Sequence, residues 1–504
     1  MLATWPAVEH VRTHFLAGGA PGHGEAAAGD HLQTGYRLWL VGHQLEHGRA
    51  PWRDPYSFRP ELAPQLNPAG WPFGLPYWPL VAALGTVLAW NAFILLTYLG
   101  AGAACYAWLR ELDVRRGAAL AGGLAFALAP YRVQQSTGHL LGPIAMLLPL
   151  ALWGYERGRR GSTAWFLLAA AALASIPLSG QVHLALGAIP FFCLYAVCRN
   201  RAPRALAGAG AAAAVAVVAG IAVQRAVVSH SLEAGHRSLA EVDFYSADWI
   251  DFLTRHQRHG SESFVLLGWI LPLLALAGLV LARRRGLSLA LAVGAVVPIL
   301  LALGTNLPLY SWLWHHLSPF RYPRVPERLL PIACLALAAL AAIAFDRLRV
   351  PALLALLVVA ADLHVRAYGA SAAGPGARAY EAIDGPGRLL ELPVLTPDVH
   401  LGSVYYLYDM RVRRERPGGY STLAPSRADE VARWLEPLNR GDWRRDRAAV
   451  LRRLGVRFVA VHEGIYEQTH RLATPDARRA ESALVAHGWR LLGRDGAVVL
   501  YGVS

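Results

Sequence analysis

The chain of 504 residues contains no lysine, so its 48 residues of the Lys and Arg class are all arginine. This absence excludes Schiff-base chemistry and a Walker A nucleotide site, because both need a lysine side chain. Cysteine is almost as rare. The four cysteines lie in apolar stretches, where they act as small hydrophobic residues: Cys105, Cys193, Cys198 and Cys334. The sequence therefore offers neither a disulfide framework nor a cysteine zinc site.

Charged residues are also few, at 16% of the chain, whereas hydrophobic residues make up 55%. A soluble domain is rarely so apolar, and the composition indicates a membrane protein. The formal net charge of +14 would suggest nucleic acid as a partner of a soluble protein. Here many arginines follow hydrophobic stretches, where they face the cytoplasm and anionic lipid. We therefore expect membrane lipid, and no nucleic acid, as a partner.

Hydrophobic stretches of the length needed to cross a bilayer, about 20 residues, recur along the middle of the chain. The predicted crossings are residues 91–109, 117–132, 140–156, 163–179, 182–198, 204–226, 264–282, 287–304, 327–345 and 350–366. Residues 72–88 are apolar too, but counting them as a crossing would move every later arginine cluster to the wrong side. We interpret them as a juxtamembrane helix, so the fold is a mainly α transmembrane bundle of about 10 to 11 crossings.

Arginine clusters occupy every second connection between these stretches. They are residues 110–116, 157–160, 199–204, 283–285 and 347–349. Cytoplasmic loops are enriched in arginine, so these connections are predicted to be cytoplasmic. The intervening connections carry carboxylates, histidines and tryptophans. Any chemistry is therefore predicted to face the outer side of the membrane.

Three parts follow from this pattern. Residues 1–90 form an N-terminal segment and first outer loop with juxtamembrane helices, 91–366 the bundle, and 367–504 a small extracytoplasmic α/β domain. In the last part, three short runs read as strands and 426–454 as a helical pattern. The strand runs are 389–395, 456–461 and 497–501.

The N-terminal 29 residues contain neither a full crossing nor a signal peptide. If residues 30–70 lie outside, either a first transmembrane helix is missing, with residues 2–11 as its remnant, or the N-terminus crosses unaided. We favour a missing helix.

The first outer loop holds the candidate catalytic acids, Asp30 and then Asp54. An aspartate just outside the membrane can accept a proton from a sugar hydroxyl and activate it for attack on an anomeric carbon. The neighbouring His31 and Gln33 are candidate substrate-binding residues. The simpler interpretation is that Asp30 caps a helix that starts at His31.

His43, Glu46 and His47 match the H-x-x-E-H pattern of inverted zinc peptidases, with both imidazoles on one helical face. No third protein ligand stands in a matching helical context, so a peptidase is disfavoured. A looser metal or phosphate contact remains open, and an exposed amphipathic helix face is the simpler interpretation.

Three arginines lie on the predicted outer side, whereas the arginine clusters described above lie on the predicted cytoplasmic side. They are Arg321, Arg324 and Arg328. One guanidinium group can bind two phosphate oxygens at once, so this cluster predicts a lipid-linked phosphate as ligand. Arg132 and His139, in another polar outer turn, are candidates for the same ligand. The alternative is that these arginines extend to lipid headgroups.

With these residues placed, the chain resembles the GT-C superfamily of membrane glycosyltransferases, in particular YfhO-like bacterial membrane proteins. The resemblance runs from Gly29 to the end of the chain. The motifs that carry it are Gly29-Asp30, Asn67-Pro68-Ala69-Gly70, residues 129–132 and 138–140, Ser246-Ala247-Asp248, residues 320–329 and residues 455–462.

The resemblance implies transfer of a sugar from a polyprenyl-phosphate-linked donor to a glycan, lipid or protein acceptor. The enzyme would lie in the bacterial cytoplasmic membrane, and Asp30 would correspond to the first-loop aspartate of the superfamily. That loop often has a pair of acids, whereas this chain has a single acid followed by His31. No cofactor is therefore assigned, and a divalent cation, magnesium or manganese, is left open.

Two other functions remain open. A lipid or polysaccharide transporter or flippase would carry ionisable residues inside its crossings, and the predicted crossings from 91 to 226 are almost free of them. A non-catalytic cell-envelope assembly protein would use its tail domain to bind a partner or polymer.

Overall fold

The computed structural model describes residues 4–60, 65–66, 68–255, 262, 264–374, 377–469 and 474–503. The protein is mainly helical, at 64%, and forms two compact units. Unit 1 is built from Ala92–Gln224 and Gly235–Ala367, and unit 2 from Pro6–Asn91, Arg225–Ala234 and Tyr368–Ser504. The N-terminal and C-terminal segments, treated separately in the sequence analysis, thus share unit 2.

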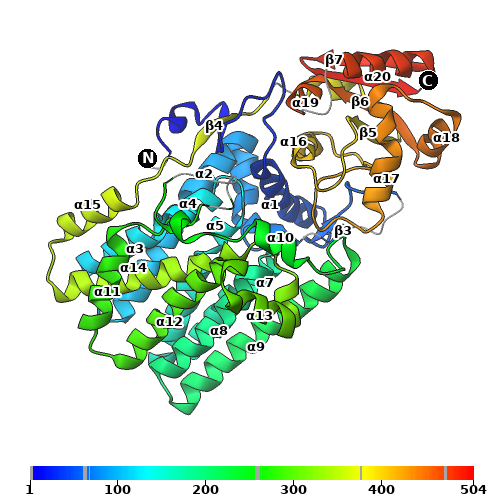
Figure 1. Cartoon of the computed structure of the whole chain (residues 1–504). Helices are drawn as coiled ribbons and strands as arrows, with labels where there is room; N and C mark the ends of the chain where they lie inside the picture. The colour runs from blue at the N-terminus through cyan, green and yellow to red at the C-terminus, as the bar shows by residue number, and fades with distance from the viewer. Residues whose placement is uncertain are drawn as a thin grey trace. The chain divides into compact units, whose positions relative to one another are not determined.

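Unit 1 is a helical bundle (Figure 1). Its helices are α2 (Gly74–Glu111, from Ala92 onward), α3 (Arg116–Ala127), α4 (Pro130–Gln135), α5 (Leu141–Ile144), α6 (Leu147–Arg160), α7 (Ala164–Leu178), α8 (Val182–Arg199), α9 (Pro203–Ala226), α10 (Leu239–Phe244), α11 (Ile270–Leu281), α12 (Arg285–Ala302), α13 (Pro308–His316), α14 (Leu330–Arg347) and α15 (Ala352–Asp362).

Helix α14 is the centre of this bundle, because its side chains from Leu330 to Phe345 are all buried. It packs against α3, α11 and α12. Small residues make the close approach possible. A Cβ atom on Gly278 of α11 would lie 1.9 Å from the carbonyl oxygen of Leu340, so only glycine fits at this crossing, as in other tightly packed membrane helices.

Five helices in the described residues are long and apolar enough to cross a membrane. They are Gly74–Glu111, Val182–Arg199, Pro203–His230, Arg285–Ala302 and Pro326–Arg347. Large apolar side chains on the outside, such as Leu167 at 73% exposure and Val280 at 77%, match a lipid-facing surface rather than a soluble one. Each predicted crossing overlaps a helix of the structure, but α7, α11 and α15 are shorter apolar helices.

The prediction of a separate juxtamembrane helix over residues 72–88 agrees with a break in α2. The segment Gly74–Glu111 consists of two helices that meet at a kink at Gly85, where φ is 72° and ψ is 171°. Glycine adopts this left-handed conformation at little cost. Near the kink, Asn91 accepts a hydrogen bond from the backbone N–H of Leu16 at 2.7 Å, which ties the N-terminal segment to α2.

Unit 2 combines α1 with a small α/β domain. Its elements include β1 (His14–Ala17), α1 (Asp30–Glu46), β2 (Arg53–Asp54), β3 (Gln65–Leu66), β4 (Gly369–Ala372), β5 (Arg388–Leu392), α16 (Ser403–Arg411), α17 (Ala428–Leu435), α18 (Arg445–Arg453), β6 (Val456–His462), α19 (Glu463–Gln468), α20 (Thr474–Ala486), β7 (Trp489–Asp495) and β8 (Val498–Val503).

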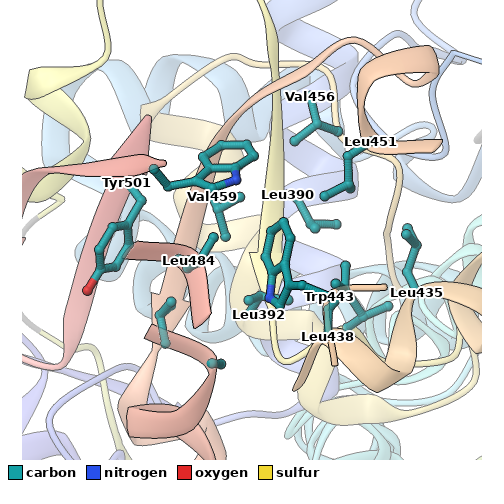
Figure 2. Close-up of a cluster of buried hydrophobic side chains, with 14 of the residues drawn as sticks. Leu390, Leu392, Leu435, Leu438, Trp443, Leu451, Val456, Val459, Leu484 and Tyr501 are labelled. Atoms are coloured by element: carbon teal, nitrogen blue, oxygen red, sulfur yellow. The ribbon is translucent and has the colours of Figure 1, made fainter. Parts of the chain in front are cut away.

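The main sheet of unit 2 has the strand order β5-β6-β8-β7, with β5 and β6 parallel and the other pairs antiparallel. Three strands fall on the three predicted runs, and β7 was not predicted. Figure 2 shows the core of this domain, where Leu390 and Val459 of the sheet lie with Leu435 of α17 and Leu484 of α20. These apolar side chains are almost fully buried, which stabilises the domain. The motif residue Asn67 lies outside the described residues.

Candidate functional site

Asp30 is the first residue of α1, and its carboxylate is held by a residue from far along the chain. Its Oδ1 accepts a hydrogen bond from the Tyr420 hydroxyl at 2.7 Å. Gly29, not Asp30, is at the N-cap, where no side-chain cap bond forms. The capping interpretation is therefore wrong. Asp30 is partly exposed, so its carboxylate combines a fixed orientation with access to solvent.

Tyr420 is itself anchored on both sides. The Tyr406 hydroxyl donates to the carbonyl oxygen of Tyr420 at 2.6 Å and lies 3.2 Å from its backbone nitrogen. The Gln33 amide of α1 donates to the same carbonyl at 2.8 Å. Gln33 thus positions the residue that contacts Asp30. Its predicted role in substrate binding stays a prediction.

His31, the neighbour of Asp30, is 4% exposed and lies between the rings of Phe15 and Trp90, with centroid distances of 5.1 and 6.2 Å. Burial lowers its pKa to about 4, although the Asp30 carboxylate acts in the opposite direction. The imidazole is therefore neutral at neutral pH. Contact with substrate stays a prediction for His31 as well.

Asp54 differs sharply from Asp30. It is fully buried, and its Oδ1 accepts bonds from the Tyr36 hydroxyl at 2.9 Å and the Tyr56 backbone N–H at 2.9 Å. Ser57 donates to it through both its hydroxyl and its backbone N–H. Burial raises the pKa of Asp54, and these hydrogen bonds oppose the rise. This geometry is that of a turn-forming residue, and it favours Asp30 over Asp54 as the base.

Unit 1 contains a second polar group. Arg328 donates through its NH2 to Oε1 of Glu262 at 2.7 Å, and Nε2 of His139 lies 3.6 Å from the same oxygen. Burial by itself would raise the pKa of Glu262, but the charges of Arg328 and His139 lower it to about 2. Glu262 is therefore ionised and holds the predicted phosphate ligand Arg328 in place.

Several buried polar atoms beside this pair have no hydrogen-bond partner among the described residues. They are both carboxylate oxygens of Glu327, the Tyr131 hydroxyl, Nδ1 of His183, Oε2 of Glu262 and Nε of Arg328. The sequence analysis missed Glu262, Glu327 and His183 as site residues. Glu327 and His183 each lie at the first turn of an apolar helix, which is the sequence signal that marks them.

The other predicted arginines are held differently. Arg132 is 1% exposed, and its guanidinium donates to the carbonyls of Ala127 and Thr97 at 2.8 and 3.0 Å. These contacts favour a structural role for Arg132.

Arg321 likewise donates to the carbonyls of Trp314 and His315 at 3.0 and 2.7 Å. Arg324 lies over the Tyr245 ring at 5.2 Å. Within the part of the chain that the structure describes, Arg324 makes no hydrogen bond. Among the arginines predicted to bind phosphate, it is therefore the one best able to bind an added anion.

A cavity of about 650 Å³ lies in unit 2 beyond the carboxyl end of β5. Ligands of open α/β sheets bind at this edge of parallel strands. Polar and charged side chains line it: Thr396, Asp398, His400, Arg433, Glu436 and Arg440.

The fold of the chain is similar to that of one solved glycosyltransferase. The solved structure of the mycobacterial arabinofuranosyltransferase AftD resembles it with a TM-score of 0.57 and 15% identity, over 95% of this chain and 42% of AftD. The chain thus spans less than half the length of AftD. At this identity the likeness shows the fold alone.

Two other solved structures resemble the chain more weakly. The oligosaccharyltransferase AglB of Archaeoglobus fulgidus has a TM-score of 0.47 and 14% identity over 95% of this chain and 70% of AglB. ArnT of Cupriavidus metallidurans has a TM-score of 0.42 and 12% identity over 98% of this chain and 95% of ArnT. No protein-family model and no curated protein matches the sequence, so the likeness to YfhO-like proteins stays a prediction.

Proposed function

We propose that the protein transfers a sugar from a polyprenyl-phosphate-linked donor to a glycan, lipid or protein acceptor. In this proposal it crosses the bacterial inner membrane about 10 to 11 times, with its C-terminal domain on the extracytoplasmic face. The observation that carries the proposal is the partly exposed Asp30 carboxylate held by Tyr420. The fold likeness to an arabinofuranosyltransferase supports it.

Asp30 is the proposed general base. Its carboxylate takes the proton of an acceptor hydroxyl, whose oxygen then forms a bond to the anomeric carbon of the donor sugar. The bond between that carbon and the donor phosphate oxygen breaks, and the polyprenyl phosphate leaves with the electron pair. The hydrogen bond from Tyr420 keeps the carboxylate oriented.

Arg324 and Arg328 are the proposed ligands of the donor phosphate, with His139 beside them. Arg324 makes no hydrogen bond with the described residues, and Arg328 has an unpartnered Nε although Glu262 holds its NH2. Guanidinium groups bind phosphate oxygens with charge-assisted hydrogen bonds.

A divalent cation such as magnesium or manganese needs several oxygen ligands. In the described residues, Asp30 belongs to no group of three side chains whose ligand atoms lie close enough to hold an ion. A magnesium or manganese ion stays a prediction, and the proposed mechanism routes no step through one.

The test is transfer of labelled sugar from a series of polyprenyl-phosphate donors by the purified chain in proteoliposomes. Asp30→Asn is expected to lower kcat by about 10²- to 10⁴-fold, the usual contribution of a general base. Arg324→Ala is expected to raise the KM for the donor by about 10- to 100-fold, the effect of a lost charged hydrogen bond.

The matched control is Asp429→Asn, which removes another unit 2 carboxylate, one that pairs only with Arg433 in the described structure. It is expected to keep the wild-type kcat and KM. If the wild-type protein transfers no sugar from any donor while labelled lipid crosses the bilayer, the transferase proposal is wrong and the flippase reading replaces it.

The cavity beyond β5 favours a second function, binding of a cell-envelope polymer by the C-terminal domain. Its mixed carboxylate, guanidinium and hydroxyl lining suits the hydroxyl groups of a polysaccharide. Co-sedimentation with cell-wall polysaccharide, compared between wild type and Arg440→Ala, tests this function. Equal sedimentation of both proteins would argue against the cavity as the binding site.

A further inference from the structure

The last turn of α1 brings three metal-ligand side chains together at the end of the helix remote from Asp30. One ring nitrogen of His43, one of His47 and one carboxylate oxygen of Glu46 all lie within 4.8 Å of one another. The centroids of the two imidazole rings are 4.4 Å apart. Helical spacing places residues three and four apart on the same face, so the sequence itself creates this group.

One nitrogen of each imidazole has a hydrogen bond that fixes the ring and leaves the other nitrogen for a metal ion. Nε2 of His43 bonds the Tyr56 hydroxyl at 2.6 Å, and the ring is stacked on Trp39 at 4.3 Å. Nδ1 of His47 donates to the carbonyl oxygen of His43 at 2.8 Å. Histidines that bind metals have such support on the second nitrogen, which sets the tautomer and the ring orientation.

The burial of the three residues differs in a way that suits an ion entering from solvent. His43 is 2% exposed, whereas Glu46 and His47 are exposed. The Glu46 carboxylate supplies a negative charge beside the two imidazoles, which favours a bound cation.

We infer that His43, Glu46 and His47 form a binding site for one divalent transition-metal ion such as zinc. Two imidazoles and one carboxylate suit zinc, nickel or copper, and not magnesium or calcium, which prefer oxygen ligands. Three protein ligands leave a coordination position for water.

This site is independent of the proposed sugar transfer. His43 lies 13 residues after Asp30 on the same helix, which corresponds to about 20 Å along the helix axis. A metal ion at His43 therefore lies far outside bonding distance of the Asp30 carboxylate.

The experiment measures metal binding by the full-length, tag-free chain in detergent after removal of metals with a chelator. Zinc is titrated and counted by elemental analysis, and cobalt(II) reports the ligands through its visible absorption. The variants are His47→Ala and Glu46→Gln, both at exposed positions, so that neither disturbs the core. His487→Ala is the matched control, because His487 is also exposed on a helix end and its Nδ1 donates to the carbonyl oxygen of Ala483 at 2.8 Å.

Wild type and His487→Ala are expected to bind one zinc ion per chain, with no competition from excess magnesium. His47→Ala is expected to weaken zinc binding at least about 100-fold, because a two-ligand site remains. Glu46→Gln is expected to weaken it less and to change the cobalt spectrum. Absence of zinc binding in wild type, or equal binding by wild type and His47→Ala, would overturn the inference.

Discussion

The two units each contain a cluster of buried charges, and the two clusters differ in how well their polar atoms are satisfied. In unit 2, His462 contacts Glu25 through Nδ1 at 2.6 Å and Glu391 through Nε2 at 2.8 Å. In unit 1, both carboxylate oxygens of Glu327 and one of Glu262 have no hydrogen-bond partner among the described residues.

A buried charged cluster whose polar atoms have hydrogen-bond partners, such as that around His462, stabilises a fold. Glu25 belongs to the N-terminal segment, Glu391 to β5 and His462 to β6, so the cluster joins the two ends of the chain within unit 2. Buried groups without partners cost free energy, and proteins rarely keep them without a use. The comparison teaches that the unit 2 cluster is structural, whereas the polar atoms around Glu327 are suited to a ligand.

Removing a charge from the satisfied cluster is expected to have the largest effect on stability. Glu391 accepts from Arg416 at 2.8 Å and contacts His462, so Glu391→Gln removes the carboxylate that these two cations share and leaves them only the carboxylates of Asp409 and Glu25. The free energy of unfolding is expected to fall by about 3–5 kcal/mol, measured by thermal unfolding in detergent. Glu381→Gln, which changes an exposed acid, is the control and is expected to leave the unfolding midpoint unchanged. Equal midpoints for both variants would show that the cluster does not hold unit 2 together.

The same cluster predicts a pH dependence. Burial would lower the pKa of His462, but Glu25 and Glu391 raise it to about 9. Because the folded pKa lies above the unfolded value of about 6.5, the stabilisation is complete below pH 6.5 and is lost as the pH rises through 9. The loss is roughly 3 kcal/mol. Unfolding midpoints between pH 6 and 10 measure it, and His462→Gln is expected to flatten the curve; a wild-type curve that rises with pH would contradict this reading.

Tyr420→Phe tests whether the hydrogen bond that orients Asp30 contributes to the rate of sugar transfer. The variant removes one hydrogen bond to the carboxylate, so kcat is expected to fall about 5- to 10-fold, the value of a single hydrogen bond. Tyr405→Phe is a useful comparison, because its hydroxyl bonds the carbonyl oxygen of Pro393 and not Asp30. If both variants lose the same fraction of kcat, Tyr420 has no specific role at the base.

The smallest effect on stability is expected for Glu327→Gln. Its carboxylate has no hydrogen bond to lose among the described residues, so the free energy of unfolding is expected to change by less than about 1 kcal/mol. This contrasts directly with the same substitution at Glu391. A loss of several kcal/mol at Glu327 would remove the distinction between the two clusters.

Much of the bundle could be predicted from the sequence because long apolar runs such as residues 327–345 leave few alternatives to a buried or membrane helix. Strand β7 could not be predicted in this way. Its Leu491 and Leu492 are exposed, at 59% and 39%, so the strand lacks the alternation of a half-buried strand. The break in α2 at Gly85 lies close to the predicted end of the juxtamembrane helix at residue 88.

The candidate site was harder to predict because its contacts join distant residues. Asp30 could be singled out from its loop, but its partner Tyr420 lies 390 residues later. The sequence favoured an exposed helix face for His43, whereas the side chain is buried. The burial arises from Trp39 and Tyr56, and no local pattern reveals such packing.

The most direct test compares Asp30→Asn, at the proposed general base, with Glu391→Gln, at the structural cluster of unit 2. The two variants are reconstituted separately in proteoliposomes prepared in the same way. Initial rates of sugar transfer are divided by the folded fraction of each protein. Asp30→Asn is predicted to lose at least about 100-fold in rate while its unfolding midpoint stays at the wild-type value. Glu391→Gln is predicted to keep the wild-type rate per folded protein and to lower the unfolding midpoint. A wild-type rate for Asp30→Asn would contradict the assignment of Asp30 as the base.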